Sequence, residues 1–320
     1  MPKKIICIGS VLQEIIYNTD NADILTKYQG KGKNKYIAFD FGSKISSNNV
    51  WRSFGGGAMN SAVTIKSMGL SVMPISIIGD DLMGHAIKRY LSKLGISSKY
   101  ISISKNNSTA FSFVLNLPKA AEHIILVSQG VLNDFKFSDY NLKREKADWL
   151  YLSSLRGAYT DFNIRSIFNF ARVRSINVFW NPGQQQIDNF IKYVKYLNQV
   201  EVLSINSTEA RDMAKSIKLG AFSISKLASK LLDYGCKRVV ITEGNKGVTY
   251  FDNVNKFKQN TKKINVINTT GAGDAFNAGF LSAYIHKGDI KLALEFGMRN
   301  SVAVLQTIGA HEGVLKKKDL

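Results

Sequence analysis

The chain contains few of the residues that build disulfide frameworks, metal clusters and disordered linkers. Its 320 residues include two cysteines, four dispersed histidines and four prolines. Cys7 and Cys236 form neither a CxxC motif nor a cluster with histidine, which argues against a disulfide framework and a structural zinc site. No low-complexity or Ser/Gly-rich tract occurs, so we expect no disordered linker. The length suits one large domain, or one domain with an appendage.

Long apolar runs are missing from the start of the chain. Residues 1–10 carry lysines followed by a short apolar run, which is too short for a signal peptide or a membrane span. We therefore expect a cytoplasmic protein without a membrane partner.

Acidic residues are also scarce. The chain has 24 Asp and Glu residues and 43 Lys and Arg residues, which gives a net charge of +19. Clustered cations would favour nucleic acid, because they release counterions from a phosphate backbone. The charges here are scattered, and the densest stretches lie between Lys27 and Lys35 and at the end of the chain. A solvated, lysine-rich surface is the favoured interpretation, and a polyanion-binding face is the alternative.

Short apolar runs alternate with helical patterns along most of the chain. This alternation predicts an α/β fold with a mainly parallel central sheet and helices on both faces. The predicted strands are residues 5–8, 72–78, 149–152, 177–180, 202–205 and 239–241. The predicted helices are residues 58–68, 83–94, 162–173, 223–232 and 275–286, and a further helix capped by Asp289 that ends at Gly309.

Two segments, residues 14–54 and 109–129, break this alternation. Their alternating, β-branched and aromatic residues predict a few antiparallel strands. Because α/β units flank each segment, we expect a small inserted β-sheet that acts as a lid over a cleft. The main domain then comprises residues 1–13, 55–108 and 130–320. Surface hairpins without function are the alternative.

The segment from Asn268 to Phe276 follows an apolar run and opens a long helix. Gly271 and Gly273 allow a ligand to approach the backbone, and the free N–H groups of a helix start attract an anion. A carboxylate at Asp274 would repel a phosphate, which suggests that it has a chemical role. It could take the proton of a hydroxyl that attacks a phosphoryl group. A simple helix cap is the alternative, and the absence of a Gly-x4-Gly-Lys-Ser/Thr motif excludes a Walker-type loop.

A second glycine cluster, Gly55 to Gly57, precedes another helix that carries Asn60. The side-chain amide of Asn60 can both donate and accept hydrogen bonds, as polyol recognition requires. Arg156 follows the predicted strand 149–152 and could favour a substrate with a carboxylate or phosphate. An ordinary surface arginine is the alternative.

Together with the motifs between them, these clusters resemble the ribokinase-like (PfkB) carbohydrate kinases over nearly the whole chain. The motifs occur in the order of the family. They are Gly55–Gly57 with Asn60, Gly79-Asp80-Asp81 with Gly84, Leu94-Gly95-Ile96, Asn181-Pro182-Gly183, Asn206-Ser207-Thr208-Glu209, Thr242-Glu243-Gly244 with Gly247, Gly271–Asp274, Asn300 and Gly309-Ala310.

The resemblance implies a kinase that transfers the γ-phosphoryl group of ATP to a hydroxyl of a sugar or sugar-like molecule. It assigns Asp274 as the general base and Gly271, Ala272 and Gly273 as the anion hole. It also implies a lid that often builds a homodimer interface. The remaining roles that it implies are acceptor binding by Gly56, Gly57 and Asn60, nucleotide binding by Asn206, Thr242, Gly244, Gly247 and Asn300, and Mg²⁺ binding near Glu209, largely through water.

Two positions depart from the family pattern. Glu14 stands where the family usually has an aspartate that binds the sugar, so the carboxylate is one methylene longer. Asn268 replaces an aspartate in a region associated with monovalent cations, so activation by K⁺ is an open question. The motifs also leave the acceptor open. A nucleoside kinase or sugar-acid kinase of the same fold, or a homologue that binds nucleotide or polyanion without turnover, remains an alternative.

Overall fold

The computed structural model describes residues 2–29, 32–47, 49–117, 122–261 and 264–320, and it is built around a nine-stranded sheet. The strand order is β15-β14-β13-β12-β11-β10-β1-β6-β7, and every pair from β13 to β7 is parallel. This confirms the predicted mainly parallel sheet. The strands are β1 (Lys4–Ile8), β6 (Ser71–Gly79), β7 (Ile101–Ser104), β10 (Trp149–Leu152), β11 (Asn177–Trp180), β12 (Val200–Asn206), β13 (Val239–Thr242), β14 (Val248–Phe251) and β15 (Lys256–Gln259).

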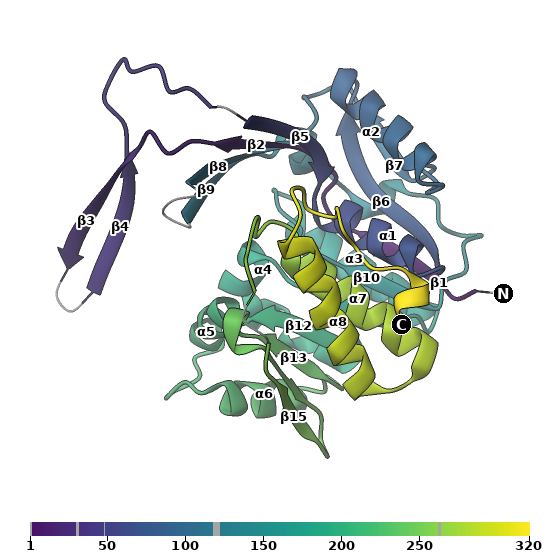
Figure 1. The fold of residues 1–320 in the computed structure, drawn as a ribbon. Coiled ribbons are helices and arrows are strands. Elements are labelled where there is room, and N and C mark those ends of the chain that lie inside the picture. The colour runs from purple at the N-terminus through teal and green to yellow at the C-terminus, as the bar shows by residue number, and fades with distance from the viewer. Residues whose placement is uncertain (1, 30–31, 48, 118–121, 262–263) are drawn as a thin grey trace.

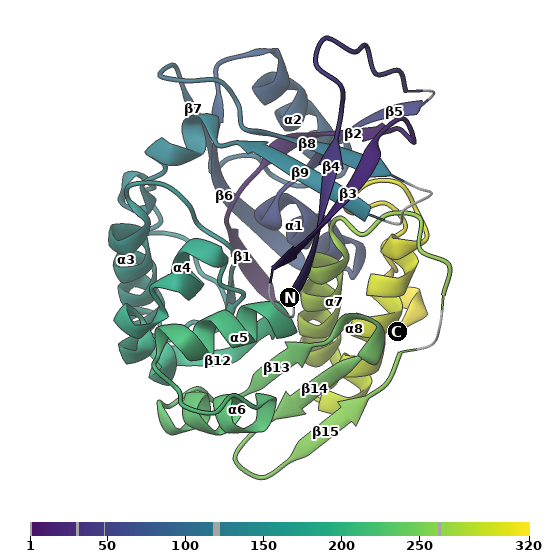
Figure 2. The same cartoon turned by 90° about the vertical axis from the view of Figure 1, so that its left-hand side faces the viewer.

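Alternating side chains of the buried strands belong to two separate hydrophobic cores, one on each face of the sheet. Ile6 and Ile8 of β1 join one core, and Ile5 and Cys7 join the other, as the twofold period of a strand requires. One face is covered by α3 (Thr160–Val173), α4 (Gln184–Asp188), α5 (Ser207–Ser216) and α6 (Ile224–Asp233). The other is covered by α1 (Gly57–Ser67), α2 (Leu82–Lys93), α7 (Ala272–Lys287) and α8 (Ile290–Leu305). The helices therefore lie on both faces, as predicted (Figures 1 and 2).

A second, four-stranded sheet lies beside the main sheet, with the order β5-β2-β8-β9. Its strands are β2 (Leu12–Asn18), β5 (Asn49–Gly55), β8 (Phe111–Leu117) and β9 (Glu122–Ser128). The prediction of antiparallel strands is wrong for β2 and β8, which pair in parallel. They run in parallel because each continues from the carboxyl end of a strand of the parallel sheet, β1 or β7. The hairpin of β3 (Asp23–Gln29) and β4 (Gly32–Ala38) extends away from the rest of the chain (Figure 1).

The ends of the last two long helices follow their local chemistry. Gly288 ends α7 in the left-handed conformation, with φ of 69°, and the Asp289 carboxylate accepts hydrogen bonds from the backbone of Lys291 and Leu292 at the start of α8. The prediction that α8 reaches Gly309 is wrong, because it ends at Leu305. The backbone N–H of Ile267 donates to the carbonyl of Leu305, so the segment before α7 occupies that carbonyl.

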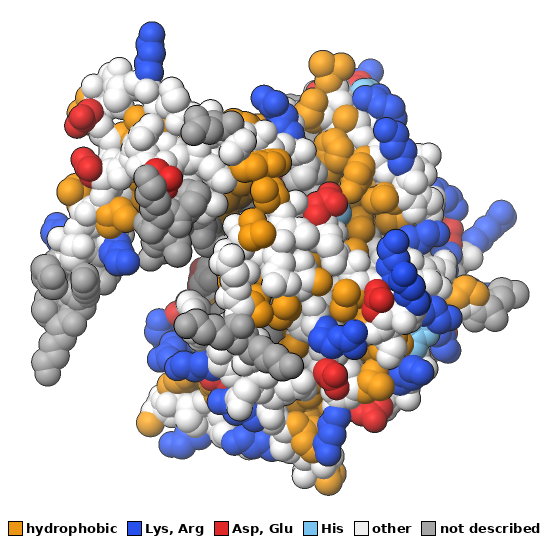
Figure 3. All heavy atoms as spheres, viewed as in Figure 1, with side chains coloured by type: hydrophobic (Ala, Val, Ile, Leu, Met, Phe, Trp, Pro, Cys, Tyr) orange, Lys and Arg blue, Asp and Glu red, His pale blue; other side chains and the backbone are white. Residues whose placement is uncertain are grey.

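The surface matches the scattered charge of the sequence. On the face shown in Figure 3, Lys and Arg side chains are spread over several elements. Among the described helices, none combines the length and the apolar character that crossing a bilayer would need.

Candidate active site

The position of the site follows from the order of the strands. The chain passes from β1 to β6 and β7 on one side, and later to β10 and β11 on the other, so the order reverses at the β1–β10 pair. Ligands of open parallel sheets bind outside the carboxyl ends of the strands at such a point. Ile8 pairs with Leu152, and Leu152 pairs with Trp180, so β1, β10 and β11 end level. Two cavities open there, of about 350 Å³ and about 190 Å³.

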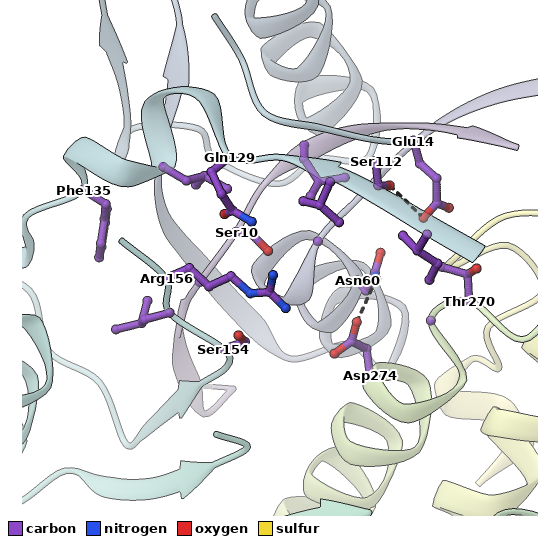
Figure 4. Close-up of a pocket in the computed structure, with 18 residues that line it drawn as sticks. Ser10, Glu14, Asn60, Ser112, Gln129, Phe135, Ser154, Arg156, Thr270 and Asp274 are labelled. Carbon is purple, nitrogen blue, oxygen red and sulfur yellow. Dashed lines mark hydrogen bonds between the residues drawn. The ribbon is translucent and has the colours of Figure 1, made fainter. Parts of the chain in front are cut away.

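The first cavity lies between the strand ends of the main sheet and the second sheet (Figure 4). Ser10 and Ser154 come from the ends of β1 and β10, and Ser112 comes from β8. The residues predicted for the acceptor or for catalysis that line this cavity are Glu14, Gly56, Asn60, Arg156, Gly271 and Asp274.

The second cavity lies at the ends of β11, β12 and β13, next to the start of α7. Asn181, Ser204 and Asn277 also line it, although sequence reasoning gave them no site role. The predicted residues that line it are Asn206, Glu209, Thr242, Gly271, Gly273 and Asp274.

Asp274 and Gly271 line both cavities. Asp274 is the third residue of α7, and its Oδ2 accepts a hydrogen bond of 2.8 Å from Nδ2 of Asn60 in α1. The fold thus brings the two glycine clusters together across the junction of the cavities. Burial raises the pKa of Asp274, and the bond from Asn60 opposes that rise.

The turn before α7 depends on glycine. Gly271 has φ of 79°, and a Cβ atom there would lie 1.9 Å from the carbonyl oxygen of Ala310, so no other residue fits without a shift. Gly273 is exposed, and a Cβ atom there would meet nothing within 4 Å. The first turn of α7 therefore leaves its backbone open to the second cavity, as an anion site requires.

Asn206 and Glu209 form a capping box at the start of α5. Oδ1 of Asn206 accepts hydrogen bonds from the backbone of Thr208 and Glu209, and Oε2 of Glu209 accepts one of 2.8 Å from the backbone of Asn206. Burial raises the pKa of Glu209, and the negative charge of Asp274 adds to the rise. The described residues contain no group of three or more His, Cys, Asp or Glu that could hold a metal ion. These few oxygen donors fit Mg²⁺ that is held mainly by phosphates and water.

Glu14 is a buried carboxyl group that faces the first cavity. Its side chain is 3% exposed, Oε1 accepts a hydrogen bond of 3.5 Å from Oγ of Ser112, and Oε2 has no partner among the described residues. Burial raises the pKa of Glu14 to about 7, and the negative charge of Asp274 adds to the rise. An open, buried oxygen on the wall of a cavity is suited to a hydroxyl group of a ligand.

Arg156 follows β10, and its guanidinium points into the first cavity (Figure 4). It makes no hydrogen bond or ion pair with any residue in the described part of the chain. The side chain of Arg156 is exposed, and its guanidinium lies near Ser10 and Ser154 in the cavity that Asp274 also lines (Figure 4).

Several predicted residues lie outside both cavities. Gly57 lies beneath the site, where a Cβ atom would come within 2.4 Å of Oγ of Ser153 and 3.9 Å of Oδ1 of Asp274. Gly244 and Gly247, with φ of 58° and 90°, shape the connection between β13 and β14. Ala272 begins α7, and Asn268 fixes the turn before it, because its Oδ1 accepts a hydrogen bond of 3.1 Å from the backbone of Thr270.

Asn300, to which the resemblance assigns nucleotide binding, lies outside both cavities. Its side chain is 0% exposed, Nδ2 donates to the carbonyl of Ala275 at 2.7 Å, and Oδ1 accepts from the backbone of Leu315 at 2.7 Å. Both polar groups are thus satisfied by the protein. Asn300 ties α8 to α7 and to the C-terminal segment.

Sequence reasoning missed several polar residues of the site. Ser10, Ser112, Gln129 and Thr270 line the first cavity, and His311 contacts Asn60 from behind it. The serines and Thr270 adjoin predicted strand ends or motifs, so a search for hydroxyl groups beside those motifs could have found them. His311 gave no signal, because a single histidine in an irregular segment is indistinguishable from a surface residue.

Comparison with known proteins agrees with this fold. The family model of the pfkB family carbohydrate kinases matches residues 2–317. The ribokinase of Haemophilus influenzae is 26% identical over 87% of this chain and 89% of its own length, and the ATP-dependent 6-phosphofructokinase of Thermoanaerobacterium thermosaccharolyticum is 23% identical over 93% and 92%. The crystal structure of the ribokinase of Thermotoga maritima superposes with a TM-score of 0.80 at 22% identity, over 99% of this chain and 97% of that chain. The chain therefore belongs to the pfkB family of carbohydrate kinases and is an ATP-dependent kinase.

Proposed function

We propose that the protein transfers the γ-phosphoryl group of ATP to a hydroxyl of a sugar or sugar-like molecule in the first cavity, with Asp274 as the general base. The observation that carries this proposal is the position of Asp274, which lines both cavities. A base must lie within hydrogen-bond reach of the attacking hydroxyl, and the phosphoryl group must lie on the other side of that hydroxyl. The position of Asp274 at the junction of the two cavities supports this role.

On the donor side, where the N–H of Ala272 already donates to the carbonyl of Thr269, the triphosphate lies in the second cavity against the backbone amides of Gly271 and Gly273. These amides stabilise the charge on the transferring group without reorganising. Asn206 and Thr242 bind the nucleotide, and Glu209 holds Mg²⁺ through water. When bound, the Mg²⁺ ion neutralises phosphate charge.

On the acceptor side, Asn60 and Glu14 bind hydroxyl groups, and Gly56 lets the ligand approach the backbone. Asp274 then accepts the proton of the hydroxyl that attacks. Because Oδ2 of Asp274 is already bonded to Asn60, Oδ1 is the oxygen that takes the proton. Positioning and electrostatic stabilisation supply most of the catalysis.

We also propose that residues 14–54 and 109–129 form the lid and that a second copy of the chain packs on it. Ile125 and Val127 of β9 line the first cavity and are each 43% exposed, and Ile124 and Leu126 of the same strand are 39% and 58% exposed. One face of the strand therefore serves the cavity, and the other leaves apolar surface for a partner. Sedimentation of the purified chain tests this proposal, since a monomer at micromolar concentration would contradict it.

The experiment that tests the function is a screen for acceptor-dependent release of ADP. The panel contains neutral sugars, sugar phosphates, sugar acids and nucleosides, each with Mg²⁺ and with or without K⁺. We expect at least one acceptor to raise ADP release well above the acceptor-free rate. The K⁺ arm decides whether a monovalent cation acts near Asn268. Salt-dependent retention on nucleic acid, together with no phosphoryl transfer to any acceptor, would favour the non-catalytic homologue instead.

A specific observation favours an acidic acceptor, such as a sugar acid or a sugar phosphate. The guanidinium of Arg156 points into the first cavity and has no partner in the described part of the chain. A carboxylate or phosphate would form charge-assisted hydrogen bonds with it. Each such bond contributes about 1.5–3 kcal/mol, or roughly ten- to a hundredfold in affinity.

The variant Arg156→Ala should therefore raise KM for an acidic acceptor about ten- to a hundredfold and leave KM for ATP nearly unchanged. Arg165→Ala is the matched control, because this arginine lies on α3, outside both cavities. If the fastest acceptor is a neutral sugar and Arg156→Ala leaves its KM unchanged, the proposal of an acidic acceptor is wrong, and the acceptor is a neutral sugar.

A further inference from the structure

A chain of three hydrogen bonds connects Asp274 to the far side of α1. Nδ2 of Asn60 lies 2.8 Å from Oδ2 of Asp274, and Oδ1 of Asn60 lies 3.0 Å from Nδ1 of His311. Nε2 of His311 lies 2.8 Å from the hydroxyl of Tyr90 in α2. The four residues come from α7, α1, the C-terminal segment and α2, so the hydrogen bonds connect distant parts of the sequence to the proposed base.

The chemistry of the groups fixes the direction of each bond. An ionised carboxylate only accepts hydrogen bonds, so the amide of Asn60 must present its NH₂ group to Asp274. Its oxygen then faces His311 and can only accept, so Nδ1 of His311 carries a proton. In a neutral imidazole the other nitrogen is an acceptor, so the hydroxyl of Tyr90 donates to Nε2. In each of the three hydrogen bonds, the donor therefore points toward Asp274.

The surroundings support this arrangement of protons. His311 and Asn60 are each 3% exposed. Burial lowers the pKa of His311 to about 4, so the imidazole is neutral at physiological pH. Burial also raises the pKa of Tyr90, and the charge of Glu312 adds to the rise, so the phenol keeps its proton.

We propose that His311 is a positioning residue that holds the side-chain amide of Asn60 with its NH₂ group toward Oδ2 of Asp274. This leaves Oδ1 of Asp274 for the acceptor hydroxyl. Without the donor at Nδ1 of His311, Oδ1 of Asn60 loses this hydrogen bond, and the bond to Asp274 alone holds the amide, so its position is less well fixed. The inference rests on the proposed function of Asp274, but the state of His311 can be measured without any acceptor.

The first test measures the protonation of His311 in the free enzyme by ¹⁵N NMR of labelled histidine. The chain has four histidines, and the signal that disappears in His311→Asn belongs to this residue. We expect a neutral imidazole with its proton on Nδ1 that does not titrate down to about pH 5. A proton on Nε2, or titration near the ordinary pKa of histidine, would overturn the inference even if the enzyme is a kinase.

Tyr90→Phe extends this test without removing the ring that packs against Phe54 and His311. The variant removes the donor to Nε2 but leaves Oδ1 of Asn60 as the acceptor for Nδ1. We therefore expect the proton to stay on Nδ1. A shift of the proton to Nε2 would show that Tyr90 rather than Asn60 sets the tautomer, and it would overturn the inference.

The second test compares two replacements of His311 with different hydrogen-bonding capacity. The amide nitrogen of His311→Asn can occupy the place of Nδ1 and donate to Asn60, whereas His311→Leu cannot. With ATP and the best acceptor of the panel, we expect kcat of His311→Leu to fall about tenfold below that of His311→Asn, the fold-change expected for one hydrogen bond. KM for ATP should stay within about twofold.

Thermal unfolding of both variants separates positioning from a structural effect. Both lose a buried imidazole, so both should unfold at lower temperature than the unmodified protein. If kcat falls equally in the two variants and follows the loss of stability, His311 is only structural and the inference is wrong. If the unmodified protein transfers no phosphoryl group to any acceptor, the proposed function is wrong and the NMR result alone decides the state of His311.

Discussion

The buried carboxyl of Glu14 should make the stability of the protein fall as the pH rises from about 4.5 to 7. Its pKa rises from 4.5 to about 7 in the folded protein, chiefly because burial disfavours the charged form. The folded state therefore holds a proton that the unfolded state has released between these two pH values. The unfolding free energy is unaffected by this shift below pH 4.5 and decreases as the pH rises from about 4.5 to 7. Above that range the decrease is complete.

The size of the effect follows from the shift in pKa. A rise from 4.5 to about 7 corresponds to about 3 kcal/mol of unfolding free energy. Glu14→Gln keeps the size of the side chain and cannot ionise. The stability of this variant relative to the unmodified protein should therefore be about 3 kcal/mol greater at pH 8 than at pH 4.5.

Urea denaturation at the two pH values measures this difference. Glu295→Gln on α8 is the control for removing one carboxyl group at an exposed position. If Glu14→Gln changes the unfolding free energy by the same amount at pH 4.5 and at pH 8, the pKa of Glu14 does not differ between the folded and unfolded states, and the reasoning from its burial is wrong.

Two further predictions concern the stability of the protein. Gly57→Ala should lower the unfolding free energy by about 1–3 kcal/mol, as overpacking does, because the new Cβ atom would lie 2.7 Å from Cβ of Ser153. In the control Gly273→Ala, the new Cβ atom meets no atom within 4 Å, so the unfolding free energy should not fall. Equal stability of the two variants in denaturant would contradict the packing at α1. Glu145→Gln should be less stable than the unmodified protein at neutral pH, because Lys4 and Lys99 hold the pKa of Glu145 down to about 2. This difference should disappear as the pH falls from about 4.5 through 2, and a constant difference in urea melts over that range would refute it.

The parts of the fold that could be predicted from the sequence are those with a strong apolar pattern. The predicted parallel strands are short apolar runs, and burial on both faces of a sheet requires such runs. Elements with weaker patterns were missed. β15 is polar because it lies at the edge of the sheet, and β7 alternates Ile with Ser. The helix α5 was also missed, although the capping box of Asn206 and Glu209 marks its start.

The candidate site was predictable where glycine or a carboxylate marks it. The residues Gly271 and Asp274 indicate a turn and a conflict of charge, and the family resemblance points to Glu14 and Asn60. Contacts between distant segments were not predictable, since no local pattern connects His311 to Asn60. Asn300 shows the converse, because a buried amide that ties two helices together looks the same in a sequence as one that binds a ligand.

The most direct test of the account is the turnover of Asp274→Asn. This variant keeps the shape of the side chain but cannot accept the proton of the attacking hydroxyl. With the best acceptor of the panel, kcat should fall at least about a hundredfold, as the loss of a general base predicts, while the affinity for ATP, measured by calorimetry, stays within about tenfold. Turnover equal to that of the unmodified protein would show that the carboxylate between the two cavities is not the base.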